Sequence, residues 1–204
     1  MATTAAPYGF IPVRKADGSP YSGARDAFLI TPAGVAQNIG YGSLVEISAG
    51  FVQLASGTGA DATTNNLGGN AIGALGVFVG CEYINSEGQL IFAQFYPSGQ
   101  ANATAYVITD PGVTFQVQAD GAIAQAALGH NAPLTGAQNA TTSVNTTTGK
   151  SKVALDATTA TATKSFKVVG FSTKAGSTIG DAKTDVLVKF NLPYHQFGTG
   201  VVGE

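Results

Sequence analysis

The chain contains no tryptophan, a single cysteine, and no lysine or arginine between Arg25 and Lys150. With Cys81 as the only cysteine, no disulfide forms within the chain and a zinc cluster of several cysteines is excluded. The long cation-free stretch carries acidic residues alone, so it cannot neutralise phosphates. The bulk of the chain is therefore not a nucleic-acid surface.

Membrane-spanning and secretory signals are also missing. No apolar run approaches the roughly 18 residues needed to cross a bilayer. The first residues, Met1 to Pro7, lack the basic and apolar regions of a secretory signal. The chain is either made in a cytoplasm or has already lost a leader, and Met1, as the sole methionine, favours the first. We expect no membrane partner.

Charge is scarce throughout the 204 residues. Charged residues make up 11% of the chain, against 44% hydrophobic residues and 27 glycines, and the formal net charge is −2. The middle is purely acidic, whereas residues 1–25 and 150–204 are net basic. A surface so poor in charge is weakly protected against association, which favours permanent assembly and salt-sensitive contacts between acidic and basic regions.

Short apolar segments rich in Val, Ile, Phe and Tyr alternate with Gly, Asn and Asp, a pattern typical of a many-stranded β protein. The expected strands are residues 26–31, 44–48, 51–55, 75–84, 90–96, 103–109, 114–117, 152–155, 166–171 and 185–192. One short helix is expected at residues 121–128, with Asp120 as its cap and Gly129 at its end. The predicted fold is all-β, an antiparallel β-sandwich or a barrel-like domain.

The clearest local unit is a hairpin that turns at Asn85 to Gly88. Strict alternation in its first strand puts Val77, Val79, Cys81 and Tyr83 on one face and Phe78, Glu82 and Ile84 on the other. Both faces are mainly apolar, so we expect this hairpin to be central in a sheet or covered by a partner.

The predicted organisation is an extended N-terminal arm, residues 1–25, followed by a single all-β domain, residues 26–204. Residues 56–70 read as a Gly/Thr/Asn loop, and residues 135–150 as a longer polar loop or insertion. A subdivision near residue 72 or near residue 150 stays open, because no charged or proline-rich linker marks either position.

Residues that carry catalysis are few and dispersed. His130 and His195 have no neighbouring ligand or carboxylate at a useful spacing, and Cys81 lies in an apolar strand where cysteine packs as a small hydrophobe. Glu82 and Glu87 flank one turn, where they more simply keep an edge soluble. We expect no enzyme activity, no catalytic residue, no cofactor and no metal.

Both ends of the chain combine aromatics with residues that favour extended backbone. Ala6 to Val13 holds two prolines and two aromatics and needs a groove, either on its own domain or on a neighbouring subunit. The C-terminal aromatics suit an interface or a frayed end equally. The predicted subunit or partner interface comprises Pro7, Tyr8, Phe10, Ile11, Pro12, Arg14, Tyr194, His195 and Phe197.

Three stretches carry a resemblance to a known family: APYGFIPV at residues 6–13, IGALGVFVGCEY at 72–83 with NSEGQ at 85–89, and DPGVTFQVQADG at 110–121. With these, the chain resembles the capsid decoration, or cement, proteins of tailed bacteriophages. The last third is similar only in texture. The resemblance implies a homotrimer or dimer on the outer surface of the phage head, bound to the major capsid protein, and implies no active site.

The expected function is therefore that of a non-enzymatic virion structural protein, made in the host bacterial cytoplasm, that stabilises contacts between capsomers. The alternative from another class is a carbohydrate-binding β-sandwich module, such as one that belongs to a virion fibre. The absence of tryptophan argues against that alternative, because sugars stack on aromatic rings.

Overall fold

The computed structural model describes residues 4–55, 73–135, 143–173 and 176–197. Within these ranges the fold is all-β and antiparallel, as predicted, and its sheets do not close into a barrel. The strands are β1 (Ile11–Arg14), β2 (Asp26–Leu29), β3 (Leu44–Ser48), β4 (Phe51–Leu54), β5 (Gly76–Ile84), β6 (Leu90–Ala93), β7 (Thr104–Ile108), β8 (Thr114–Gln118), β9 (Asn131–Ala132), β10 (Val144–Asn145), β11 (Lys150–Ser151), β12 (Phe166–Phe171) and β13 (Asp185–Phe190). Two 3-10 turns, η1 (Gln125–Ala127) and η2 (Leu192–Tyr194), complete the described secondary structure.

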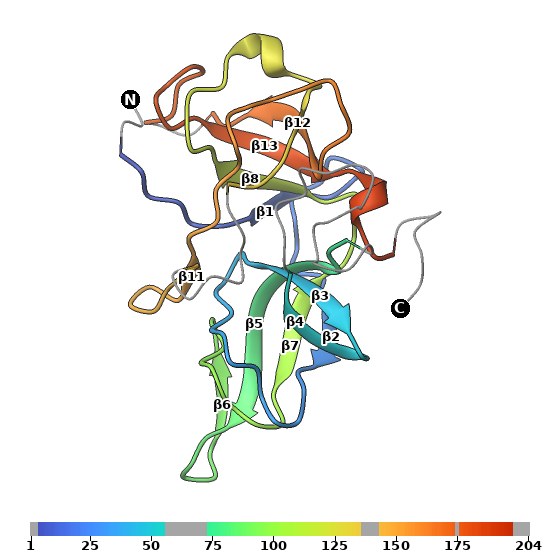
Figure 1. Ribbon diagram of the computed structural model, residues 1–204, viewed down its shortest axis with the longest axis vertical. Coiled ribbons are helices and arrows are strands. Elements are labelled where there is room, and N and C mark those ends of the chain that lie inside the picture. Colours follow the sequence, from blue (N-terminus) through green and yellow to red (C-terminus); the bar gives the residue numbers. More distant parts are fainter. Residues whose placement is uncertain (1–3, 56–72, 136–142, 174–175, 198–204) are drawn as a thin grey trace.

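Two sheets form two lobes stacked along the long axis of the molecule (Figure 1). Sheet A, in the order β1-β8-β13-β12-β9, builds the upper lobe. Sheet B, in the order β2-β7-β5-β3-β4 with β6 also paired to β5, builds the lower lobe. The chain starts in sheet A, builds all of sheet B, and then returns to sheet A.

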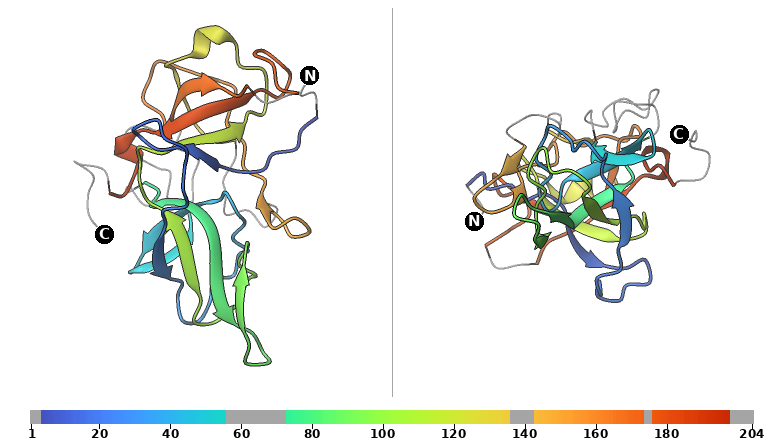
Figure 2. Two further views of the ribbon diagram at one scale, coloured as in Figure 1. Left: turned by 180° about the vertical axis from the view of Figure 1, so that it is seen from behind. Right: turned by 90° about the horizontal axis from the view of Figure 1, so that it is seen from below.

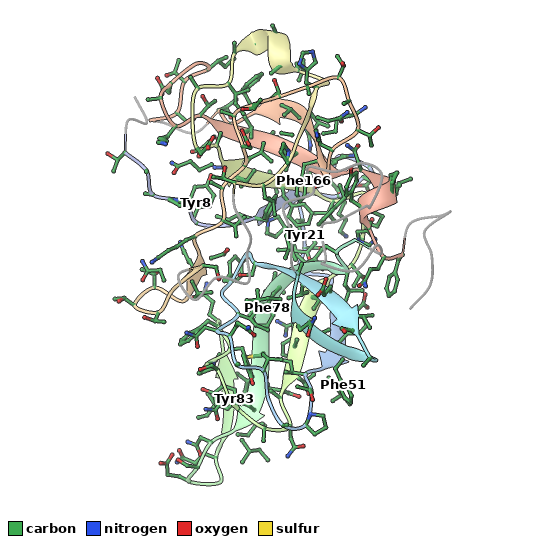
Figure 3. The ribbon with its side chains drawn as sticks, in the orientation of Figure 1. Tyr8, Tyr21, Phe51, Phe78, Tyr83 and Phe166 are labelled. Atoms are coloured by element: carbon green, nitrogen blue, oxygen red, sulfur yellow. The ribbon has the colours of Figure 1, made fainter. Side chains whose placement is uncertain are left out.

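Each lobe has its own apolar cluster. The upper core gathers Phe10, Phe115, Phe166 and Phe190, whereas the lower core gathers residues of sheet B such as Phe78. Figure 3 shows Phe166 in the upper lobe and Phe78 in the lower. Strand β5 contributes to both, because Val77 packs in the upper core and Phe78 in the lower core.

A bulge in β5 changes the predicted faces of the central hairpin. The pairing register between β5 and β7 shifts between Phe78 and Gly80, and Gly80 has a φ of 150°. Beyond the bulge, Cys81 and Tyr83 lie on the same side as Phe78, against the lower core. The assignment of Phe78 and Cys81 to opposite faces was wrong, because an extra residue inverts the alternation.

The N-terminal segment lies in the chain's own upper lobe. Strand β1 pairs with β8, and the Phe10 ring, with no exposed surface, stacks on Phe166 at 4.7 Å between centroids. The backbone N–H of Phe10 donates to the Gly42 carbonyl at 2.9 Å. A division at residue 25 thus follows β1 of sheet A and precedes β2 of sheet B.

The C-terminal segment links the two lobes. Tyr194 is buried in the upper core, and its carbonyl accepts the N–H of Ala74 at 2.9 Å. The side-chain amide of Gln196 accepts the N–H of Ile47 at 2.8 Å and donates to the Ile47 carbonyl at 3.1 Å. Gln196 therefore pairs with β3 much as another strand would.

Several local predictions differ from the structure. Residues 121–128 form only the turn η1, because Asp120 accepts the N–H of Ala157 at 2.8 Å and caps no helix. No strand covers residues 152–155, whereas β10 and β11 form a small hairpin within the tract expected to be a polar loop. The loop at residues 56–70 and most of residues 135–142 lie outside the described residues.

Candidate functional site

One face of sheet B is lined by large side chains that the described part of the chain leaves exposed. Cross-strand register places these side chains together: Glu82 lies opposite Phe92 and Thr104, Ile84 opposite Leu90, and Leu29 opposite Thr104. We call this the outer face of sheet B. Its members are Ala27, Leu29, Glu82, Ile84, Leu90, Phe92, Thr104 and Tyr106.

The outer face is apolar and exposed. Leu29 and Ile84 each expose 59% of their surface, Leu90 exposes 57% and Phe92 69%. The opposite face of the same strands packs on the lower core, through residues such as Cys81. The β5–β6 hairpin projects from the end of the lower lobe furthest from sheet A (Figure 2). Apolar side chains gathered in this way on one face mark an interaction site.

A short polar line crosses the outer face. The Arg25 guanidinium lies over the Tyr106 ring, 4.1 Å from its centroid, and the Tyr106 hydroxyl donates to Glu82 Oε2 at 2.8 Å. This hydrogen bond to a carboxylate raises the pKa of Tyr106. A shallow hollow of about 210 Å³ lies between Arg25, Tyr106 and Phe92.

Charges of opposite sign sit at the two ends of the face. Arg25 precedes β2 at the end of sheet B nearest sheet A, as the pairing of Asp26 with Val107 shows. Glu87 lies in the turn between β5 and β6, at the far end of the hairpin. Among the described residues, neither Arg25 nor Glu87 takes part in an ion pair within the chain.

Cys81 borders the hollow but is buried. Its Sγ approaches the Phe95 carbonyl at 3.5 Å, and burial raises the pKa of the thiol to about 12. A thiol with this pKa is protonated at neutral pH and is a poor nucleophile. The structure therefore supports the packing role that the sequence indicates.

The predicted interface residues lie elsewhere and do not form one surface. Phe10, Tyr194 and His195 are fully buried, so they are not available to a partner in this conformation. Tyr8 is partly buried; its hydroxyl donates to Asp185 at 2.9 Å and accepts from the Gln116 amide at 2.7 Å. Pro7, Ile11, Pro12 and Arg14 are half-buried along the edge of sheet A, whereas Phe197 is 57% exposed.

The two histidines do not meet in the structure. His195 lies beside Phe190 at the junction of the lobes, and its Nδ1 accepts the N–H of Phe197 at 3.2 Å. Burial lowers the pKa of His195 to about 4, against the weaker opposing effect of Asp110. A neutral, enclosed imidazole of this kind acts as a packing residue.

The described part of the chain contains no cluster of three His, Cys, Asp or Glu residues that could hold a metal ion. Its helices are also all too short to cross a membrane. No protein-family model matches the chain, and comparison with curated proteins and with solved structures found no match either.

The outer face includes residues that the predicted interface omitted. Leu29, Leu90 and Phe92 carry much of its exposed surface. The sequence signal that could have identified this face is the apolar pattern on both faces of the β5–β6 hairpin, which predicts a central or covered position. Only strand pairing shows that Leu29, which is distant in sequence, completes the same face.

Proposed function

We propose that this chain is a non-enzymatic structural protein of a bacteriophage virion that binds the outer surface of the head and stabilises contacts between capsomers. The observation that carries the proposal is the exposed apolar outer face of sheet B, a surface that a permanent assembly would cover, whether between copies of the chain or against the shell. In a chain with only 11% charged residues, such a face favours permanent assembly. The resemblance of the chain to capsid decoration proteins favours the phage head as the site of assembly, and the major capsid protein as the partner.

The physical demands of this role agree with the architecture. A protein that reinforces a shell needs a rigid body and apolar contact surface. The β-sheets on two apolar cores supply the rigid body, and the outer face of sheet B supplies apolar surface for association. Each buried Å² contributes about 25 cal/mol before the cost of ordering. Repetition of weak contacts over a shell then multiplies their effect through avidity.

Purified protein mixed with undecorated heads tests the proposal. We expect the protein to sediment with the heads and to raise the temperature at which they release DNA. Absence of binding, or binding with no gain in heat resistance, would refute the proposal. If the protein does not bind the heads but binds a glycan array, the carbohydrate-binding alternative is established instead.

A further inference from the structure

We propose that the outer face of sheet B is the contact between two copies of this chain, which pack face to face about a two-fold axis. The inference rests on the proposed function in one respect only, that the chain belongs to a permanent assembly. It names the occupant of the face as a second copy of the chain and leaves the shell contact to another surface.

The exposed area is suited to such a contact. Leu29, Ile84, Leu90 and Phe92 leave roughly 450 Å² of mainly apolar surface in water, judged from the 150–250 Å² of large side chains. Two copies therefore contribute about 900 Å² from these side chains alone, and the flanking residues bring the total near 1,200 Å², the lower end of the range for specific interfaces. A monomer that left this surface in water would be prone to aggregate.

The charges make the face complementary to itself. Positive charge lies at one end, on Arg25, and negative charge at the other, on Glu87. A two-fold axis that crosses the strands reverses their direction, so the Glu87 end of each copy faces the Arg25 end of the other. The contact then gains two equivalent ion pairs, and a shifted or parallel arrangement gains neither.

The polar groups within the face support this assignment. Glu82 already accepts the Tyr106 hydroxyl inside its own chain, so it is a less available partner for an incoming arginine. Arg25 is held by stacking on Tyr106, a contact that itself uses none of the hydrogen-bond donors of the guanidinium. The side chain is therefore oriented before association.

The first experiment measures mass against concentration by analytical ultracentrifugation. We expect the full chain to be a dimer and the double variant Leu90→Thr/Phe92→Thr to dissociate at least tenfold more readily. A matched control replaces two apolar residues of the upper lobe, Leu128 and Ile179, which are 47% and 45% exposed, by threonine. This control should leave the mass unchanged, and circular dichroism should report the same β content in all three proteins.

The second experiment exchanges the charges. Arg25→Glu and Glu87→Arg should each weaken the dimer about tenfold, and the double variant should recover the wild-type constant within about threefold. Lys167→Glu makes the same charge change as Arg25→Glu on the exposed part of sheet A and should have no effect.

The outcomes separate the two proposals. A monomer at all concentrations, or a dimer unaffected by Leu90→Thr/Phe92→Thr, overturns the inference even if the protein binds heads. Failure of the charge exchange to restore dimers overturns the two-fold arrangement. A dimer with these responses that does not bind heads upholds the inference and refutes the proposed function. If Leu90→Thr/Phe92→Thr abolishes head binding without changing the mass, the shell is the occupant and the inference fails.

Discussion

Replacement of Phe10 by alanine should destabilise the protein strongly. The ring has no exposed surface, stacks on Phe166 at 4.7 Å and meets Phe115 edge-on at 6.3 Å. Phenylalanine-to-alanine changes in such cores cost about 3–5 kcal/mol, through lost transfer free energy and the cavity that remains. Two lost aromatic contacts place the expected loss in the upper part of that range.

Chemical denaturation followed by circular dichroism measures this loss. The difference from the wild type should be the same at low and high protein concentration, because β1 lies in the chain's own sheet A. Phe197→Ala, at an exposed ring, serves as the control and should cost less than about 1 kcal/mol. A loss below about 1 kcal/mol for Phe10→Ala would show that the ring is not in the core. A loss that grows on dilution would show that the N-terminal segment docks on a neighbouring copy.

Three further substitutions test other parts of the structure. His195 has a pKa near 4 in the folded protein and near 6.5 in the unfolded chain. Its contribution to stability is therefore complete above pH 6.5 and falls as the pH drops toward 4. His195→Phe should remove about 3 kcal/mol of this pH dependence, measured as the difference in unfolding free energy between urea titrations at pH 7 and pH 4. Ala49→Asn should raise the melting temperature, with a gain of about 1 kcal/mol, because Ala49 has a φ of 50° in the two-residue turn between β3 and β4; equal or lower stability would contradict this. Gly73→Ala should lower the free energy of unfolding by more than about 2 kcal/mol in thermal melts, because the added Cβ would lie 2.3 Å from the Tyr194 carbonyl. Unchanged stability would mean that this contact with the C-terminal segment is absent.

The sequence predicted a strand's bounds well where polar or small residues border the apolar run at both ends. β3 and β12 have the predicted bounds, since each is a β-branched or aromatic run bordered by polar or small residues. β1 was missed because its proline reads as an arm, although Pro12 tolerates a position on the edge of sheet A. The two faces of β5 were predicted wrongly beyond Gly80, because a bulge there inverts the alternation of side chains and no change in composition marks it.

Long-range pairing was beyond the reach of local pattern. β1 pairs with β8 about a hundred residues away, and only this pairing shows that the N-terminal segment completes sheet A. Part of the candidate site could be predicted from the sequence, because Ile84 and Leu90 flank a polar turn on an apolar hairpin. The position of Leu29 on the outer face could not be predicted, since it depends on the pairing of β2 with β7.

Strand β5 has a consequence for how the molecule responds to heat and force. Its adjacent residues Val77 and Phe78 belong to different cores, so neither core can open without displacing a strand of the other. We therefore expect the upper lobe and the lower lobe to melt together in one cooperative transition, although each has its own sheet. A pull on the hairpin tip at Glu87 should likewise be transmitted along β5 into the upper lobe, so we expect the two lobes to respond to force together.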